Sequence, residues 1–195
     1  MAKQLHTTPT KEEKISIDEA FNILDRIIGF INNCDTKTSI ILGGALAIIA
    51  VVFSTDGLTK IYNITKLILQ PNIGKPTGVG VLYITLLLIF AVVLTVGLIF
   101  LVLSLVGRTS SKVHKSCKNS KIFFGHISSV DSPEKFRKSI FASSKDDLLN
   151  DILNQIYINS KICSKKFKLY NWGLCLSIIG LGMMIVLFVI GVFYF

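Results

Sequence analysis

The sequence predicts an all-α membrane protein in which three transmembrane helices carry a helical cytoplasmic extension. Three windows contain no Asp, Glu, Lys, Arg or His, namely residues 39–53, 78–107 and 172–195. Hydrophobic residues make up 51% of the 195 residues and the mean hydropathy is +0.61, which is too apolar for an ordinary soluble domain of this size. The basic residues lie mainly in two of the segments between these windows.

Each window has to be long enough to cross a bilayer, which takes about 20 apolar residues for about 30 Å of hydrocarbon. The second and third windows are long enough, and we expect spans at residues 78–107 and 169–195. The first window is marginal, so a span at residues 36–55 competes with a buried hairpin helix. Because the first 35 residues are polar, we expect no cleaved signal peptide.

The orientation is predicted from the 21 basic residues, since translocation disfavours Lys and Arg in short loops. Five precede the first window, three lie between the first two windows, and thirteen lie between Arg108 and Asn171. We therefore expect a multi-pass membrane protein with a cytoplasmic N-terminus, an external loop at residues 56–77 and an external C-terminus. The net charge of +9 is then explained by the excess of basic residues on the cytoplasmic side and by their attraction to anionic lipid headgroups. We therefore expect no nucleic-acid polymer as a partner.

A flexible tail is expected at residues 1–15, followed by an amphipathic helix at residues 16–34. Ser16 and Glu19 have the spacing of a capping box. An apolar stripe follows at steps of three and four residues and ends near Asn33. The polar face carries more acidic than basic groups, which favours a protein partner for this helix over a flat position on the membrane.

The cytoplasmic insert is expected to occupy residues 108–168. It begins with a Ser/Lys-rich connector, continues with an extended, strand-like piece at 122–128, and has a short helix opened by Ser132 and Pro133. A longer helix begins near Asp146 and meets no break before the C-terminus. Its apolar stripe and that of residues 16–34 are expected to cover each other. Residues 59–70 are a candidate interfacial helix.

Enzyme chemistry is not predicted. The three histidines lie apart, and no metal-binding, nucleophile or phosphate-cradling motif is present. Asp146 and Asp147 are a metal pair in one interpretation and a helix start in the favoured one. The cysteines, Cys34, Cys117, Cys163 and Cys175, are expected to be free thiols.

Small residues recur at four-residue spacing in the predicted spans, which allows helices to approach closely within one chain or between copies. They are Ser39, Gly43 and Ala47, then Ala91 and Thr95, then Gly173 and Ser177. In the cytoplasmic part, basic groups and aromatic rings form either a phosphate and base site or a solvated face near anionic lipid. These residues are Lys37, Lys121, His126, Arg137, Lys138 and Lys145, with Phe123, Phe124 or Tyr157 for stacking.

Several stretches together resemble the Pycsar effector family over about residues 17–195. They are Cys34-Asp35-Thr36-Lys37-Thr38-Ser39-Ile40-Ile41-Leu42-Gly43, Phe123-Phe124-Gly125-His126-Ile127, Asp151-Ile152-Leu153-Asn154-Gln155-Ile156-Tyr157, Ser160-Lys161-Ile162 and Lys166-Phe167. The resemblance implies a bacterial antiphage effector that is activated by a cyclic pyrimidine nucleotide, cyclic UMP or cyclic CMP, from a partner cyclase. It then impairs the inner membrane and stops growth.

The same resemblance implies a set of ligand-binding residues, with no catalytic residue, metal or cofactor. These are Asp35, Lys37, Phe124, Gly125, His126, Gln155, Tyr157 and Lys161. The ligand is expected to lie in the insert and the helical extensions, and the protein to be a homo-oligomer. Two alternatives stay open, which are a constitutive membrane adaptor that docks a partner protein and a holin-like pore.

Overall fold

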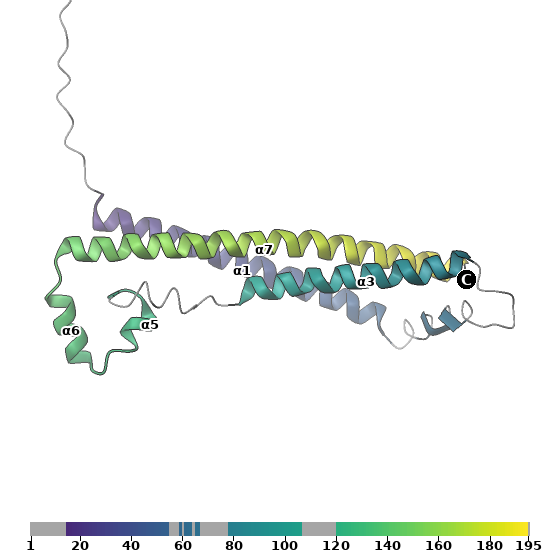
Figure 1. The fold of residues 1–195 in the computed structure, drawn as a ribbon, viewed down its shortest axis with the longest axis horizontal. Helices are drawn as coiled ribbons and strands as arrows, with labels where there is room; N and C mark the ends of the chain where they lie inside the picture. Colours follow the sequence, from purple (N-terminus) through teal and green to yellow (C-terminus); the bar gives the residue numbers. More distant parts are fainter. Residues whose placement is uncertain are drawn as a thin grey trace, which may run out of the picture. The chain divides into compact units, whose positions relative to one another are not determined.

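The computed structural model describes residues 15–54, 59, 61–63, 65–66, 78–106 and 120–194. These residues contain no strand, and three of their helices are long and apolar enough to cross a membrane. The chain is therefore an all-α, multi-pass membrane protein, as the sequence predicted. The helices in Figure 1 are α1 (Ile17–Val52), α3 (Gly78–Leu105), α5 (Phe124–Ile127), α6 (Pro133–Phe141) and α7 (Lys145–Tyr194).

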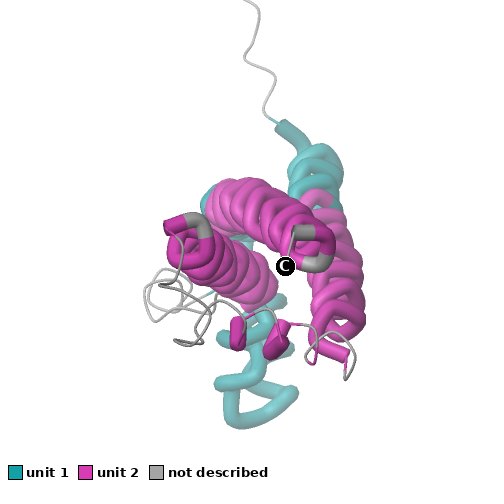
Figure 2. The backbone as a smooth tube through the Cα atoms, turned by 90° about the vertical axis from the view of Figure 1, so that its right-hand side faces the viewer, with its two compact units in different colours: residues 1–29, 109–161 teal, residues 30–108, 162–195 magenta. Residues whose placement is uncertain are grey.

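Two compact units divide the chain (Figure 2). We call Met1–Gly29 with Thr109–Lys161 the insert unit, and Phe30–Arg108 with Ile162–Phe195 the membrane unit. The helices α1 and α7 each contribute residues to both units. The expected N-terminal tail and the Ser/Lys-rich connector lie outside the described residues, whereas residues 59, 61–63 and 65–66 of the candidate interfacial helix are helical.

The start of α1 is the predicted capping box. The Ser16 N–H donates to Glu19 Oε2 at 2.8 Å, and the Glu19 N–H donates to Ser16 Oγ at 3.1 Å. The predicted end near Asn33 is wrong, because α1 continues without a break to Val52. The polar residues that follow Asn33 include neither Gly nor Pro, and the Thr38 hydroxyl donates to the Cys34 carbonyl at 2.7 Å within the helix.

The core of the insert unit confirms that the two predicted apolar stripes cover each other. Ala20 and Leu24 of α1 are buried with Ile152 of α7. Partly buried residues surround them, including Leu149 and Ile156. Apolar burial therefore holds the start of α1 against the first turns of α7.

The expected extended piece at residues 122–128 is also wrong, because its centre forms the short helix α5. The cause is local, since Ser120 Oγ accepts hydrogen bonds from the N–H groups of Ile122 and Phe123 at 3.3 and 2.9 Å and closes a turn. The predicted start of α6 is confirmed, with the Lys135 N–H donating to Ser132 Oγ at 3.3 Å and Pro133 at the first position.

The long helix α7 is continuous for 50 residues, as predicted. Its start is a second capping box, in which the Ser144 hydroxyl and N–H both donate to the Asp147 carboxylate, at 2.7 and 3.0 Å. These hydrogen bonds hold the pKa of Asp147 below its usual range. Asp147 therefore has a helix-start role, and no group of three potential metal ligands occurs in the described part of the chain.

Glycines set the contact between α3 and α7 in the membrane unit. Gly97 lies against Ser177, Gly173 against Leu101 and Gly180 against Leu94, so an added Cβ at any of these glycines would meet backbone atoms within 3.0 Å. The contacts pair in opposite order along the two helices, which makes them antiparallel. The Tyr83 hydroxyl continues this register by donating to the Leu187 carbonyl at 3.1 Å.

The small residues noted in the sequence differ in whether they lie at a contact between helices. Gly173 and Ser177 lie at the contact between α3 and α7. Ser39, Gly43 and Ala47 are exposed on α1, and nothing lies within 4 Å of a Cβ placed on Gly43. Cys34, Cys163 and Cys175 are free thiols, and Cys117 lies outside the described residues.

Gly180→Ala is expected to lower the thermal stability of the purified protein in detergent. The new Cβ would lie 2.6 Å from the Leu94 backbone nitrogen, and overpacking of this kind costs about 1–3 kcal/mol. The matched control is Gly182→Ala on the same helix, where nothing lies within 4 Å of the added atom. Equal melting temperatures for the two variants, followed by circular dichroism, would contradict the close packing.

Candidate functional site

The eight residues expected to bind the ligand are divided between the two units. Asp35 and Lys37 belong to the membrane unit. The other six belong to the insert unit and lie on two helices. Phe124, Gly125 and His126 are consecutive in α5, and Gln155, Tyr157 and Lys161 lie on α7.

Gln155 anchors the segment that leads into α5. Its side chain is buried, and Nε2 donates to Ser120 Oγ at 3.4 Å. The next residue, Lys121, donates its N–H to Asp151 Oδ2 at 2.6 Å, and its ammonium is hydrogen-bonded to the Ser143 hydroxyl. Two groups on one face of α7 therefore fix the backbone at residues 120–121, only a few residues before α5.

Tyr157 and Lys161 form a pair one turn apart on α7. The Lys161 ammonium lies 5.3 Å from the centroid of the Tyr157 ring, within cation–π range. The Tyr157 side chain is 63% exposed. The pair thus offers solvent a flat aromatic face with a positive charge over it.

Gln155 and Tyr157 do not share a face of α7, because two residues correspond to about 200° around a helix. Gln155 faces the protein interior, whereas Tyr157 faces outward. The Gln155 side chain therefore holds the segment before α5 and does not share a surface with Tyr157 and Lys161.

The residues of α5 are presented by that anchored segment. Phe124 is 66% exposed, and its ring packs on Phe123 with the centroids 4.9 Å apart at a tilt of 50°. The His126 and Gly125 positions are partly buried. The segment therefore offers a second exposed aromatic ring and an imidazole close to it in sequence.

Asp35 is engaged inside the membrane unit. Its carboxylate accepts a hydrogen bond from the Lys166 ammonium at 2.6 Å, with 35% of the Asp35 side chain and 5% of the Lys166 side chain exposed. This ion pair joins α1 to α7. Lys37 lies two residues further along α1 and is exposed, so the two family-motif residues point to different sides.

A second polar contact lies one turn beyond Asp35. The hydroxyls of Thr38 and Ser104 are 3.2 Å apart and share a hydrogen bond, and both side chains are fully buried. This contact joins α1 to α3. The ion pair and the hydroxyl pair together tie all three long helices within the membrane unit.

Sequence reasoning missed Lys166 and Ser104 as partners. A usable signal exists for Lys166, which lies fourteen residues after the buried Ile152 and seven before the buried Gly173 on α7. A lysine in such a line of buried positions needs an opposite charge as its partner. Ser104 carries no comparable signal, since serine is ordinary in a membrane helix.

The comparisons with known proteins agree with this arrangement of motifs. The family model described as "Pycsar effector protein domain" matches residues 19–194. The chain belongs to the Pycsar effector family. It is also similar to the Pycsar effector protein GmPycTM of Gulbenkiania mobilis, with 38% identity over 164 residues, which covers 80% of this chain and 83% of that protein. No solved structure matches.

Membership of the Pycsar effector family sets the broad function. The chain is a transmembrane effector of Pycsar antiphage defence, and its three apolar helices agree with that class. All five stretches that carry the resemblance lie inside the matched residues. The membrane-helical fold of this family favours a non-enzymatic effector.

Asp35→Ala is expected to destabilise the protein by about 3 kcal/mol, near the lower end for breaking a buried ion pair because Asp35 stays partly exposed. The substitution leaves the Lys166 ammonium buried without its partner. The double variant Asp35→Leu/Lys166→Met should recover most of the loss in a thermal melt. The control Lys37→Ala removes an exposed charge of the same motif. A loss of stability in Lys37→Ala as large as that in Asp35→Ala would contradict a specific role for the Asp35–Lys166 ion pair.

Proposed function

We propose that cyclic UMP or cyclic CMP, made by a partner cyclase, binds this effector and causes it to impair the bacterial inner membrane. Family membership and the three apolar helices support the role. The observation that carries the mechanism is the continuity of α1 and α7, which both run unbroken from the insert unit into the membrane unit. Growth arrest follows from loss of the membrane barrier, and no catalytic step is required.

The ligand-binding surface that we propose consists of Phe124, Gly125, His126, Tyr157 and Lys161. Exposed aromatic rings such as Phe124 and Tyr157 can stack on a pyrimidine base. The Lys161 ammonium can leave the Tyr157 ring for the cyclic phosphate, which is a stronger partner for a cation. Gln155 acts by holding the segment before α5 through Ser120.

Asp35 and Lys37 have a different role in the proposal. Asp35 is bound to Lys166, so it sets the packing of α1 on α7 in the membrane unit. Lys37 is exposed and available to lipid phosphate or a second copy. If one packing state binds the nucleotide more tightly by about 3 kcal/mol, saturating ligand shifts the ratio of states by about 150-fold.

Self-assembly is part of the proposal, since the uncharged spans suit disruption by clustering better than selective conduction. The small residues Ser39, Gly43 and Ala47 are exposed on α1 and leave room for another helix. Gly43→Leu should weaken self-association measured by analytical ultracentrifugation in detergent. Self-association equal to that of the unaltered protein would exclude this face.

The proposed orientation places the N-terminus and the insert in the cytoplasm and the C-terminus outside. It predicts that a cysteine introduced at Asp56 or Gly57 reacts with a membrane-impermeant maleimide added to whole cells. The native cysteines are first replaced by Ser or Ala. Labelling only after the cells are broken would show that the protein has the opposite orientation.

The central functional prediction concerns nucleotide-dependent leakage. Full-length protein in liposomes should release a trapped dye when cyclic UMP or cyclic CMP is added, with cyclic AMP as the ligand control. Tyr157→Ala/Lys161→Gln should lose binding by calorimetry and lose leakage, because both the stacking ring and the ammonium are removed. The matched control is Phe141→Ala/Arg137→Gln, which removes another cation–π pair of the insert unit, on α6, where the Arg137 guanidinium carbon lies 5.7 Å from the centroid of the Phe141 ring.

Other outcomes of the same experiment would support one of the alternative functions. Leakage of the same size without any nucleotide would indicate a holin-like pore. No leakage together with no nucleotide binding would reject the proposal and favour a constitutive adaptor. If the double variant on α6 lost as much binding and leakage as the double variant on α7, Tyr157 and Lys161 would not be specific ligand contacts.

A further inference from the structure

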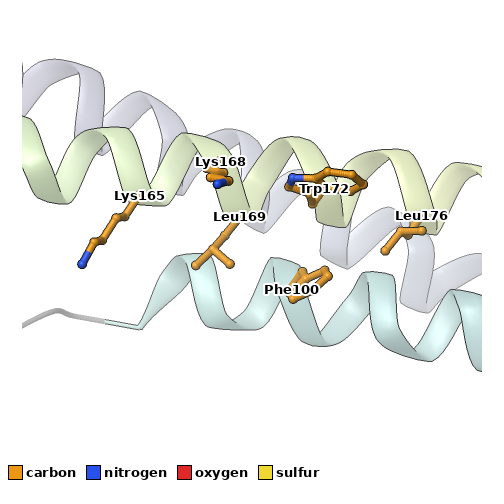
Figure 3. Close-up of a pocket in the computed structure, with 6 residues that line it drawn as sticks. All are labelled: Phe100, Lys165, Lys168, Leu169, Trp172 and Leu176. Atoms are coloured by element: carbon orange, nitrogen blue, oxygen red, sulfur yellow. The ribbon is translucent and has the colours of Figure 1, made fainter.

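A cavity of about 630 Å³ lies on the surface of the membrane unit between α3 and α7 (Figure 3). Its size is in the range of sites for small organic ligands. The residues that line it are Phe100 of α3 and Lys165, Lys168, Leu169, Trp172 and Leu176 of α7. None of them belongs to the nucleotide-binding surface proposed above.

The lining changes character along α7. Lys165 and Lys168 lie at one end, whereas Leu176 lies within the uncharged stretch that begins at Trp172. At 1.5 Å per residue, Lys168 and Leu176 are about 12 Å apart along the helix. One end of the cavity is therefore cationic and the other end is apolar, over the length of a headgroup and the first carbons of an acyl chain.

Neither Lys165 nor Lys168 forms an ion pair with a residue that the structure describes. Asp35 is the one acidic side chain among the described residues of the membrane unit, and it is bound to Lys166. The cationic end thus keeps its charge for an anion from outside the chain.

Trp172 marks the boundary between the two ends. It lies one turn after Lys168, and 57% of its side chain is exposed although it lines the cavity. Tryptophan prefers the interface between headgroups and hydrocarbon. Its position agrees with ammonium groups at headgroup depth and with Leu176 and Phe100 at acyl-chain depth.

We propose that this cavity binds an anionic phospholipid. Lys165 and Lys168 contact the phosphate, Trp172 packs at the glycerol level, and Phe100 and Leu176 contact an acyl chain. A soluble phosphate compound would use the same ammonium groups but would leave the apolar end unfilled. The apolar lining therefore favours the lipid over free phosphate or a nucleotide.

Trp172 is the only tryptophan in the chain, so its fluorescence reports on this cavity alone. The full-length protein is reconstituted in phosphatidylcholine bilayers that contain phosphatidylglycerol, with bromine on the acyl chains of one lipid or the other. Quenching by each brominated lipid gives their relative association constant at the site. Because one lysine at a membrane surface changes lipid affinity about five-fold, we expect phosphatidylglycerol to be favoured by about five-fold or more.

Lys165→Gln/Lys168→Gln should abolish this preference and leave quenching by phosphatidylcholine unchanged. The matched control, Lys138→Gln/Lys145→Gln, removes two exposed lysines from the insert unit and should keep the preference. Equal quenching by both lipids in the unaltered protein would overturn the proposal. Loss of quenching by brominated phosphatidylglycerol when millimolar inorganic phosphate or cyclic UMP is added would also overturn the proposal, because the site would then bind a soluble phosphate compound.

Discussion

The structure depends on one constraint, which is that α7 is a single helix of 50 residues. Such a helix needs neighbours along one side, and most of its buried positions lie at multiples of seven residues from Ile152. Ile152, Lys166, Gly173, Gly180 and Leu187 all follow this repeat. A seven-residue repeat keeps one face of a helix turned toward its neighbours, as in a coiled coil. Within the insert unit α1 provides the cover, and within the membrane unit α1 and α3 do.

The residues on the covered face change with their surroundings. In the insert unit Ile152 packs against Ala20 and Leu24, where removal of apolar surface from water stabilises the contact. In the membrane unit lipid removes most of that driving force, and glycines at 173 and 180 instead allow backbone contact with α3. Between these regions Lys166 is buried, and its ion pair with Asp35 fixes the pairing of α1 with α7. The type of contact therefore changes along α7, from apolar burial to an ion pair and then to close backbone packing.

Most of the fold could be predicted because it follows from local sequence. The local signals are the uncharged windows, the capping box at Ser16, the N-cap at Ser132 and the absence of Gly or Pro breaks along most of α7. One of the two wrong predictions took the polar stretch after Asn33 for a helix end, and the other took the aromatic-rich stretch at 122–128 for an extended piece. The residues after Asn33 stay helical because the Thr38 hydroxyl is satisfied within the helix, and the segment at 122–128 turns because Ser120 caps it.

The site was harder to predict because its contacts join distant parts of the chain. The family motifs supplied Asp35, Gln155 and Tyr157, but they did not indicate that Asp35 pairs with Lys166 or that Gln155 binds Ser120. Asp35 meets Lys166 across 131 residues, and Gln155 meets Ser120 across 35. The spacing of Gln155 and Tyr157 already placed them on different faces of a helix. Two of the eight predicted residues, Asp35 and Gln155, therefore act through packing in this account, and Lys37 has a separate role. The other five form the proposed ligand surface.

The claim that ligand binding acts on the spans through an unbroken α7 is tested most directly by breaking that helix beside the unit boundary. Ser164 is exposed on α7, and Ser164→Pro removes a backbone hydrogen bond and strains the preceding turn, a change that costs about 3 kcal/mol. Nucleotide-dependent dye leakage is measured for this variant and for Ser164→Ala, with nucleotide binding checked for both. The account predicts that Ser164→Pro binds the nucleotide but no longer leaks, whereas Ser164→Ala does both. Leakage that persists in Ser164→Pro at the level of Ser164→Ala would contradict it.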